Sequence, residues 1–78
     1  MTITPDQSRM ARAALRWSLD DLAEASGLGR ATLARFELGN TVANETAAKI
    51  RAAFEHERVK FVDTGPLKGA VYSGLRRA

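Results

Sequence analysis

Apolar residues recur at helical spacing through most of the chain and give way to shorter strand-like runs near its end. From residue 5 to residue 57 the apolar positions return about every three to four residues, which is the period of an amphipathic helix. Turn and capping residues interrupt this part at three places. The pattern therefore predicts four helices, and they begin at Pro5, at Leu19, at Arg30 and after Asn44.

The predicted helix boundaries rest on capping chemistry. Thr4 is expected to cap the first helix, and Ser18 with Asp21 three residues later is a near match to a capping box at the start of the second. Gly27 can adopt the left-handed conformation that ends a helix. Asn44 is predicted to cap the fourth helix.

The inward faces of the helices follow from their apolar stripes. The first helix carries Met10, Ala13, Ala14 and Trp17 at helical spacing, and the fourth carries Ala47, Ile50, Ala53 and Phe54. Trp17 and Phe36 both fall on an inward stripe, so core packing is favoured over stacking on a nucleic acid.

The last twenty residues have a different character. Residues 59–62 and 70–73 are rich in β-branched and aromatic residues, as strands are, and turn signals at residues 64–66 and at Gly69 separate them. The expected fold is mainly α. A four-to-five-helix bundle with a helix-turn-helix occupies residues 4–57, and a short β-hairpin with a basic C-terminus occupies residues 58–78.

Length and composition narrow the function classes. A chain of 78 residues is one small domain, too short for a two-lobed enzyme. The absence of cysteine excludes disulfides, thiolate zinc and thiol catalysis, and a lone His56 excludes a multi-histidine metal site. No cofactor is expected. No apolar run approaches the roughly 18 residues of a membrane span, and the N-terminus lacks a signal peptide, so we expect a cytoplasmic protein with no membrane partner.

Charge adds a candidate partner. Twelve basic residues against nine acidic ones leave a net charge of +3, and nine of the twelve are arginine, the residue favoured for bidentate contacts to phosphate and guanine. Basic and acidic residues occupy different segments, as expected of a protein with one face toward a polyanion. The acidic residues Asp20, Asp21 and Glu24 suit the start of a helix better than a paired-carboxylate catalytic site. Arg9 and Arg16 are expected to be surface charges.

The block of residues 19–38 has the features that a helix-turn-helix needs. Ala23 is small enough for a close approach of two helices, and Gly27 makes the turn four residues later. Apolar anchors to the body of the domain are Leu22, Leu28, Leu33 and Phe36. The residues expected to point outward on the second helix of the motif are Arg30, Ala31, Ala34 and Arg35.

Residues 18–40 resemble the XRE class of helix-turn-helix proteins, the phage repressor and Cro type. The small residue, the turn glycine, the anchors and the Phe36-Glu37-Leu38-Gly39 ending are all in register, and the resemblance extends from Arg12 to Phe54. The strand-like end is similar to short members of this class. The resemblance implies a sequence-specific regulator, first of all a repressor, that inserts the helix at residues 30–38 into the major groove of double-stranded DNA.

The same resemblance assigns roles to single residues. The base-contacting positions are Arg30, Ala31 and Arg35. The phosphate-contacting positions are Thr32, Asn40 and Thr41. An ion pair between Arg12 and Glu37 is expected to tie the first helix to the end of the recognition helix.

The expected assembly is a homodimer on a palindromic operator, because one short recognition helix covers only about half a turn of duplex. A lone two-stranded hairpin is only marginally stable in water, so pairing with the hairpin of a second copy is expected to stabilise it. The predicted dimer interface consists of Val59, Phe61, Val71 and Tyr72, and the fourth helix is the alternative interface. An antitoxin-like or adaptor module, whose C-terminal strands bind a partner protein, is the alternative function. No small-molecule effector is evident.

Overall fold

The computed structural model describes residues 3–64 and 67–72. In this part of the chain four helices precede two strands. The elements are α1 (Pro5–Leu15), α2 (Leu19–Ser26), α3 (Arg30–Glu37), α4 (Asn44–Glu55), β1 (Val59–Thr64) and β2 (Leu67–Tyr72). The fold is mainly helical and ends in a short hairpin, which confirms the fold class predicted from the sequence. No helix among these residues is both long and apolar enough to span a membrane.

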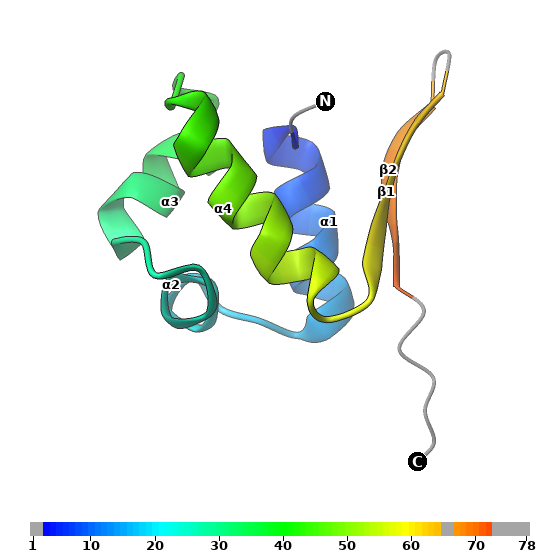
Figure 1. Ribbon diagram of the computed structural model, residues 1–78, viewed down its shortest axis with the longest axis horizontal. Helices are drawn as coiled ribbons and strands as arrows, with labels where there is room; N and C mark the ends of the chain where they lie inside the picture. The colour runs from blue at the N-terminus through cyan, green and yellow to red at the C-terminus, as the bar shows by residue number, and fades with distance from the viewer. Residues whose placement is uncertain (1–2, 65–66, 73–78) are drawn as a thin grey trace.

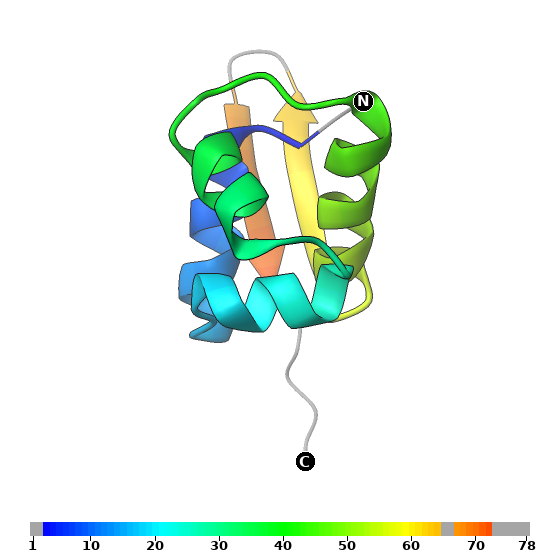
Figure 2. The same ribbon diagram turned by 90° about the vertical axis from the view of Figure 1, so that its left-hand side faces the viewer.

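The elements form three layers. Figure 1 shows α4 beside α1, with the helix-turn-helix of α2 and α3 on one side and the hairpin on the other. In Figure 2, α2 and α3 lie nearest the viewer and the hairpin lies behind α1 and α4. The core lies between these layers and consists of Ile3, Ala11, Leu22, Leu33, Phe36, Ala47, Ile50, Ala53, Phe54 and Val59.

Local capping signals correctly predicted the start of the first helix and both ends of the second. The first helix ends at Leu15, so Trp17, which was placed on its apolar stripe, lies beyond it. The Thr4 hydroxyl accepts a hydrogen bond from the Gln7 backbone N–H, and the Gln7 side chain accepts one from the Thr4 N–H. Ser18 and Asp21 form the same reciprocal box at α2. Gly27 ends α2 with a φ of 76°, a left-handed conformation that glycine adopts at little steric cost.

The start of α4 differs from the prediction. Ala43 is the capping residue and makes no side-chain hydrogen bond, so Asn44 is the first residue of the helix and not its cap. Val42, just before it, packs against the core. We attribute the position of this helix start to packing of the loop and of the α4 stripe, because no capping side chain is involved.

The apolar stripe was predicted correctly for α4 and incorrectly for α1. All four stripe residues of α4 are buried. On α1, in contrast, Met10 is 44% exposed and the two predicted alanines are also exposed. The buried positions of α1 are Gln7, Ser8 and Ala11. Hydrophobic periodicity cannot identify such a face, because two of its three residues are polar and satisfy hydrogen bonds to other elements.

The two strands pair antiparallel from Val59 opposite Tyr72 to Thr64 opposite Leu67. Gly69 was predicted to lie in the turn, but it lies within β2 opposite Val62. Its carbonyl accepts a hydrogen bond from Nε2 of Gln7 at 3.1 Å. A backbone acceptor of the hairpin is thereby joined to α1.

Aromatic rings connect the hairpin to the helical core. The Phe54 ring of α4 stacks on Trp17 with a centroid distance of 5.7 Å and meets the edge of Phe61 at 6.0 Å. Val59 is only 1% exposed. Phe36 lies in the core and the partly buried Trp17 packs against it, so core packing is confirmed for both, and β1 contributes Val59 to the same core.

Candidate nucleic-acid interface

The turn between α2 and α3 fixes the relative placement of the two helices. The Gly27 N–H donates to the Ala23 carbonyl at 2.9 Å, and the Leu28 N–H donates to the Ser26 hydroxyl at 3.3 Å. Leu22 and Leu33 are fully buried and attach one helix each to the core. The α3 helix is therefore held from its inner side, and its outer side is left for other contacts.

The outer side of α3 carries three of the residues predicted to read bases. Arg30, Ala31 and Arg35 are exposed, whereas Ala34, which was also expected to point outward, is half-buried. Arginine side chains are long enough to reach base edges in a major groove, and a small residue such as Ala31 lets the helix backbone come close. This surface has the residue types that direct base readout requires.

The two arginines of this surface differ in their surroundings. The Nε of Arg30 lies 3.1 Å from Oδ1 of Asp20, which is near the start of α2. The side chain of Arg35 forms no ion pair or hydrogen bond with any residue that the structure describes. The Asp20 contact was not foreseen from the sequence, because ten positions separate the two residues and no helical repeat brings them together.

The predicted phosphate-contacting residues lie on α3 and just beyond it. Thr32 is half-buried within the helix, and Asn40 and Thr41 are exposed in the loop that follows. Gly39 turns the chain there with a φ of 102°. Their contact with phosphate stays a prediction, because the structure contains the protein alone.

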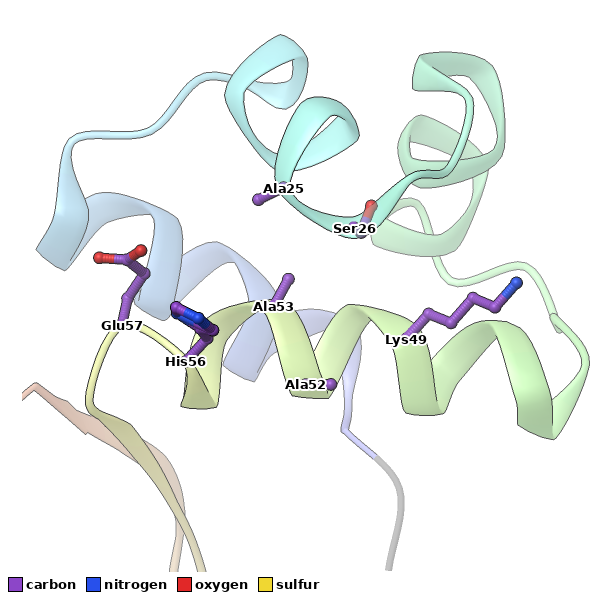
Figure 3. A pocket seen from close by; sticks show the side chains of 7 residues that line it. All are labelled: Ala25, Ser26, Lys49, Ala52, Ala53, His56 and Glu57. Atoms are coloured by element: carbon purple, nitrogen blue, oxygen red, sulfur yellow. The ribbon is translucent and has the colours of Figure 1, made fainter.

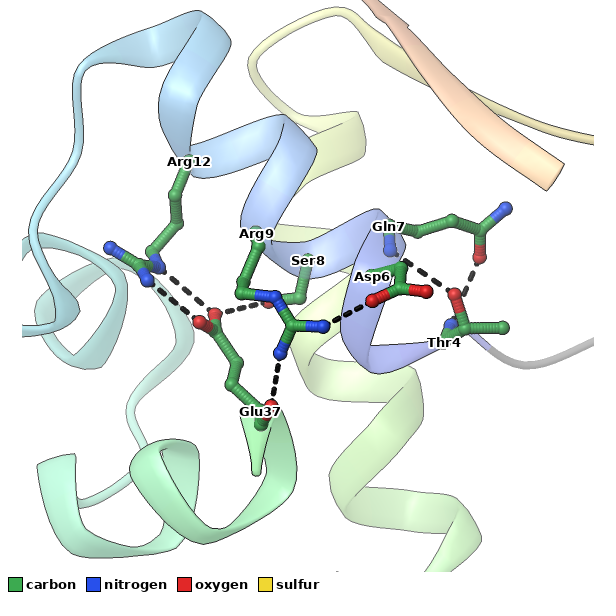
Figure 4. A network of polar contacts seen from close by, with 7 residues as sticks. All are labelled: Thr4, Asp6, Gln7, Ser8, Arg9, Arg12 and Glu37. Carbon is green, nitrogen blue, oxygen red and sulfur yellow. Dashed lines mark hydrogen bonds and ion pairs between the residues drawn. The ribbon is translucent and has the colours of Figure 1, made fainter. Parts of the chain in front are cut away.

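The far end of α3 is fixed by the side chain of Glu37 (Figure 4). Arg12 donates to both carboxylate oxygens, from Nη2 to Oε1 at 2.7 Å and from Nε to Oε2 at 2.9 Å. Ser8, which is fully buried, donates its hydroxyl to Oε2 at 2.6 Å. The expected ion pair is present, and Ser8 is a third member that the sequence did not reveal.

Arg9, which was expected to be a surface charge and is exposed, also contacts the end of α3. Its guanidinium donates to the backbone carbonyl of Glu37 and pairs with Asp6. The last carbonyls of a helix lack partners within the helix, so a cation at this place satisfies one of them and favours the dipole. Two arginines of α1 therefore fix one helix end.

These contacts shift the titration of the ion pair. Burial raises the pKa of Glu37, but the hydrogen bonds from Arg12 and Ser8 and the charges of Arg12 and Arg9 lower it by more. The net result is a pKa below the ordinary value of a glutamate. The hydrogen bond to Glu37 likewise raises the pKa of Arg12, so both groups stay charged at neutral pH.

An open hollow of about 450 Å³ lies between α2 and α4 (Figure 3). Alanines form its middle, with Lys49 at one end and His56 and Glu57 at the other. None of the predicted DNA-contacting residues lines it, and its polar groups do not converge on one point. The described residues also contain no cluster of three or more side chains that could hold a metal ion.

The residues predicted to form a dimer interface differ in how much surface they leave for a second copy. Val59 is buried in its own chain and Phe61 is half-buried against Phe54, so Val59 offers no side-chain surface to a second copy. Val71 and Tyr72 are paired in β2, and their side chains lie outside the described part of the structure.

A comparison with models of known protein families finds a helix-turn-helix match over residues 9–55. The match covers more than half of the chain and includes most of α1 together with all of α2, α3 and α4. The hairpin lies outside it. A search of curated proteins finds no match.

Proposed function

The chain belongs to the XRE-type helix-turn-helix family of DNA-binding regulators, and on that basis we propose that it is a sequence-specific repressor that inserts α3 into the major groove of duplex DNA. We also propose that it acts inside the cell on duplex DNA, with the cytoplasm as the expected location. No cofactor and no enzymatic step are part of this proposal.

The observation that carries the proposal is the two-sided character of α3. Leu33 and Phe36 are buried on one side, and Glu37 is held by α1. The opposite side exposes Arg30 and Arg35, which are five residues, or about 1.4 turns, apart. A rigidly held helix with exposed arginines at this spacing is suited to bidentate contacts with guanine O6 and N7.

Phosphate contacts supply the second part of the proposal. Thr32 lies within α3, and Asn40 and Thr41 lie in the loop that follows it. Hydroxyl and amide side chains that contact phosphates fix the register of a protein on the duplex. The net charge of +3 favours the encounter with DNA and predicts weaker binding as salt is added.

We also propose that the protein acts as a homodimer on a palindromic site. One helix reads too few base pairs for useful specificity, and a two-fold dimer places two recognition helices roughly 34 Å apart on one face of the DNA. In the described part of the chain the hairpin is a two-stranded sheet with one face against α1 and α4, so two edges and one face remain for a second copy.

Selection of bound sequences from random duplexes tests the proposed readout. The wild type should enrich a palindromic motif. Arg30→Ala and Arg35→Ala should each lose the preference at one base pair per half-site, by about 1–3 kcal/mol. Lys49→Ala, which removes one charge from an exposed position on α4, serves as the charge-matched control and should keep the whole motif. An unchanged motif in both arginine variants would contradict the assignment of α3.

A further inference from the structure

The contact between Asp20 and Arg30 joins the beginnings of the two helices of the motif. The Oδ1 atom of Asp20 lies 3.1 Å from Nε of Arg30, and the side chains are 77% and 63% exposed. An ion pair this exposed contributes little to folding. Its carboxylate nevertheless lies beside a guanidinium group on the face that is proposed to meet DNA.

The contact with Asp20 is made at Nε of Arg30, and this determines which N–H donors of the guanidinium remain available for DNA. A guanidinium carries five N–H donors in a planar fork, and a carboxylate on Nε leaves the two Nη groups free at the far end. Two parallel donors at that end match the O6 and N7 acceptors of guanine. We propose that Asp20 is a positioning residue that holds Arg30 for bidentate recognition of guanine, so that each half-site contains a G·C pair at the position read by Arg30.

This inference rests on the proposed DNA-binding function and adds the base that one position prefers. The contrast within α3 supports it. Arg35 has no such partner among the described residues, so its side chain must be ordered entirely by the DNA. A side chain already held in its bound geometry loses less conformational freedom on binding, and it tolerates fewer alternative acceptors.

The charge of Asp20 makes the proposal distinguishable from a general electrostatic effect. A carboxylate near the phosphate backbone lowers affinity for every sequence, because it repels the polyanion. A positioning role for Asp20 raises the selectivity for guanine at one position. Removal of the side chain is therefore expected to move total affinity and selectivity in opposite directions.

The experiment compares Asp20→Ala with Glu24→Ala, which removes the same charge from another exposed position of α2. Affinities are measured for duplexes of the selected motif and for duplexes in which only the Arg30-dependent position is changed. Both variants should bind unrelated DNA more tightly than the wild type. Only Asp20→Ala should reduce the preference for guanine at that position, by about fivefold, which corresponds to a partial loss of one bidentate contact. The double variant Asp20→Ala, Arg30→Ala should be no less selective there than Arg30→Ala alone.

Each other outcome overturns a specific claim. If guanine preference in Asp20→Ala is unchanged or increased, Asp20 is a surface charge or a competitor of DNA, and the positioning role is wrong while the proposed function stands. If Arg30→Ala loses preference for a base other than guanine, the predicted base is wrong. If the wild type enriches no motif, the proposed function fails, and this inference fails with it.

Discussion

Burial of the Glu37 carboxylate has a desolvation penalty, but the contacts that this side chain makes still stabilise the fold. It is 7% exposed, and its carboxylate accepts hydrogen bonds from a guanidinium and from a buried hydroxyl. A buried ion with all its partners in place is tolerated, whereas removal of one partner leaves the other unpaired. In this protein, removal of the Glu37 carboxylate would take a hydrogen-bond acceptor from both Arg12 and Ser8.

We therefore expect Glu37→Ala to lower the free energy of unfolding by about 3–5 kcal/mol, because it leaves Arg12 and Ser8 without their acceptor. Urea or thermal denaturation measures the change. The control is Glu55→Ala, which removes an exposed i,i+4 partner of Arg51 and should cost at most about 1 kcal/mol. Equal melting temperatures for Glu37→Ala and the wild type would refute the structural role of the pair.

The lowered pKa of Glu37 gives a pH dependence of known sign. A carboxyl group whose pKa is lower in the folded state contributes stability above its unfolded pKa of about 4.3, and this contribution disappears as the pH falls through the folded value. The wild type should therefore lose more stability than Glu37→Gln between about pH 5 and pH 3. Parallel pH profiles of the two proteins in urea denaturation would show that this carboxylate is not the responsible group.

At the scale of the elements, α1 connects the hairpin to α3. Two consecutive residues do this in different directions, since Gln7 donates to the Gly69 carbonyl of β2 and Ser8 donates to Glu37 of α3. Both residues are almost fully buried. The polar face of α1 is thus an internal interface, and the helix joins the layers on its two sides.

Gln7→Glu tests the connection to the hairpin. The new side chain keeps an oxygen for the capping box at Thr4, but it has no N–H for the Gly69 carbonyl. An unsatisfied buried acceptor costs about 1–3 kcal/mol, and a charge at a buried position adds to the loss. Hydrogen exchange should show faster exchange in β2. Unaltered protection of the β2 amides would mean that this hydrogen bond does not hold the hairpin.

The elements also show which parts of the fold the sequence could predict. Local signals correctly predicted the ends of α2, because Ser18, Asp21 and Gly27 act on their own helix ends, whereas the predicted cap at Asn44 was wrong. Features that depend on distant neighbours were missed unless the family resemblance supplied them, as it did for the pair of Arg12 and Glu37. Ser8 and Arg9 have no local mark of their contact with Glu37, which lies almost thirty positions away. The exposed face of α3 was predicted from the apolar anchors of the motif, and its base-contacting role came from the family resemblance. The contact of Asp20 with Arg30 emerged only from the folded chain.

For the molecule as a whole, the hairpin changes the design of the dimer test. Truncation of the chain before Val59 would remove a core residue together with any interface, so loss of dimerisation would be ambiguous. A single charged residue on β2 avoids this problem. Val71 is paired with Lys60, which is exposed.

We expect Val71→Glu to convert the proposed dimer into a folded monomer. Glutamate opposite Lys60 forms a favourable cross-strand pair within one chain, whereas two copies would bring like charges into a shared apolar interface. Sedimentation measures the oligomeric state, and DNA affinity for the palindrome should fall steeply. Val71→Ile is the matched apolar control. A dimer that survives Val71→Glu would instead favour the interface on α4.

The division of α3 into a held side and a free side has a consequence for how such a regulator can be retargeted. Leu33, Phe36 and Glu37 keep the helix in place, while positions 30, 31 and 35 lie outside the core. Substitutions at those three positions can change the preferred operator without a penalty in the core. Where Arg30 is replaced, Asp20 no longer has a guanidinium to position. Positions 20 and 30 should therefore change together in related proteins that bind different operators.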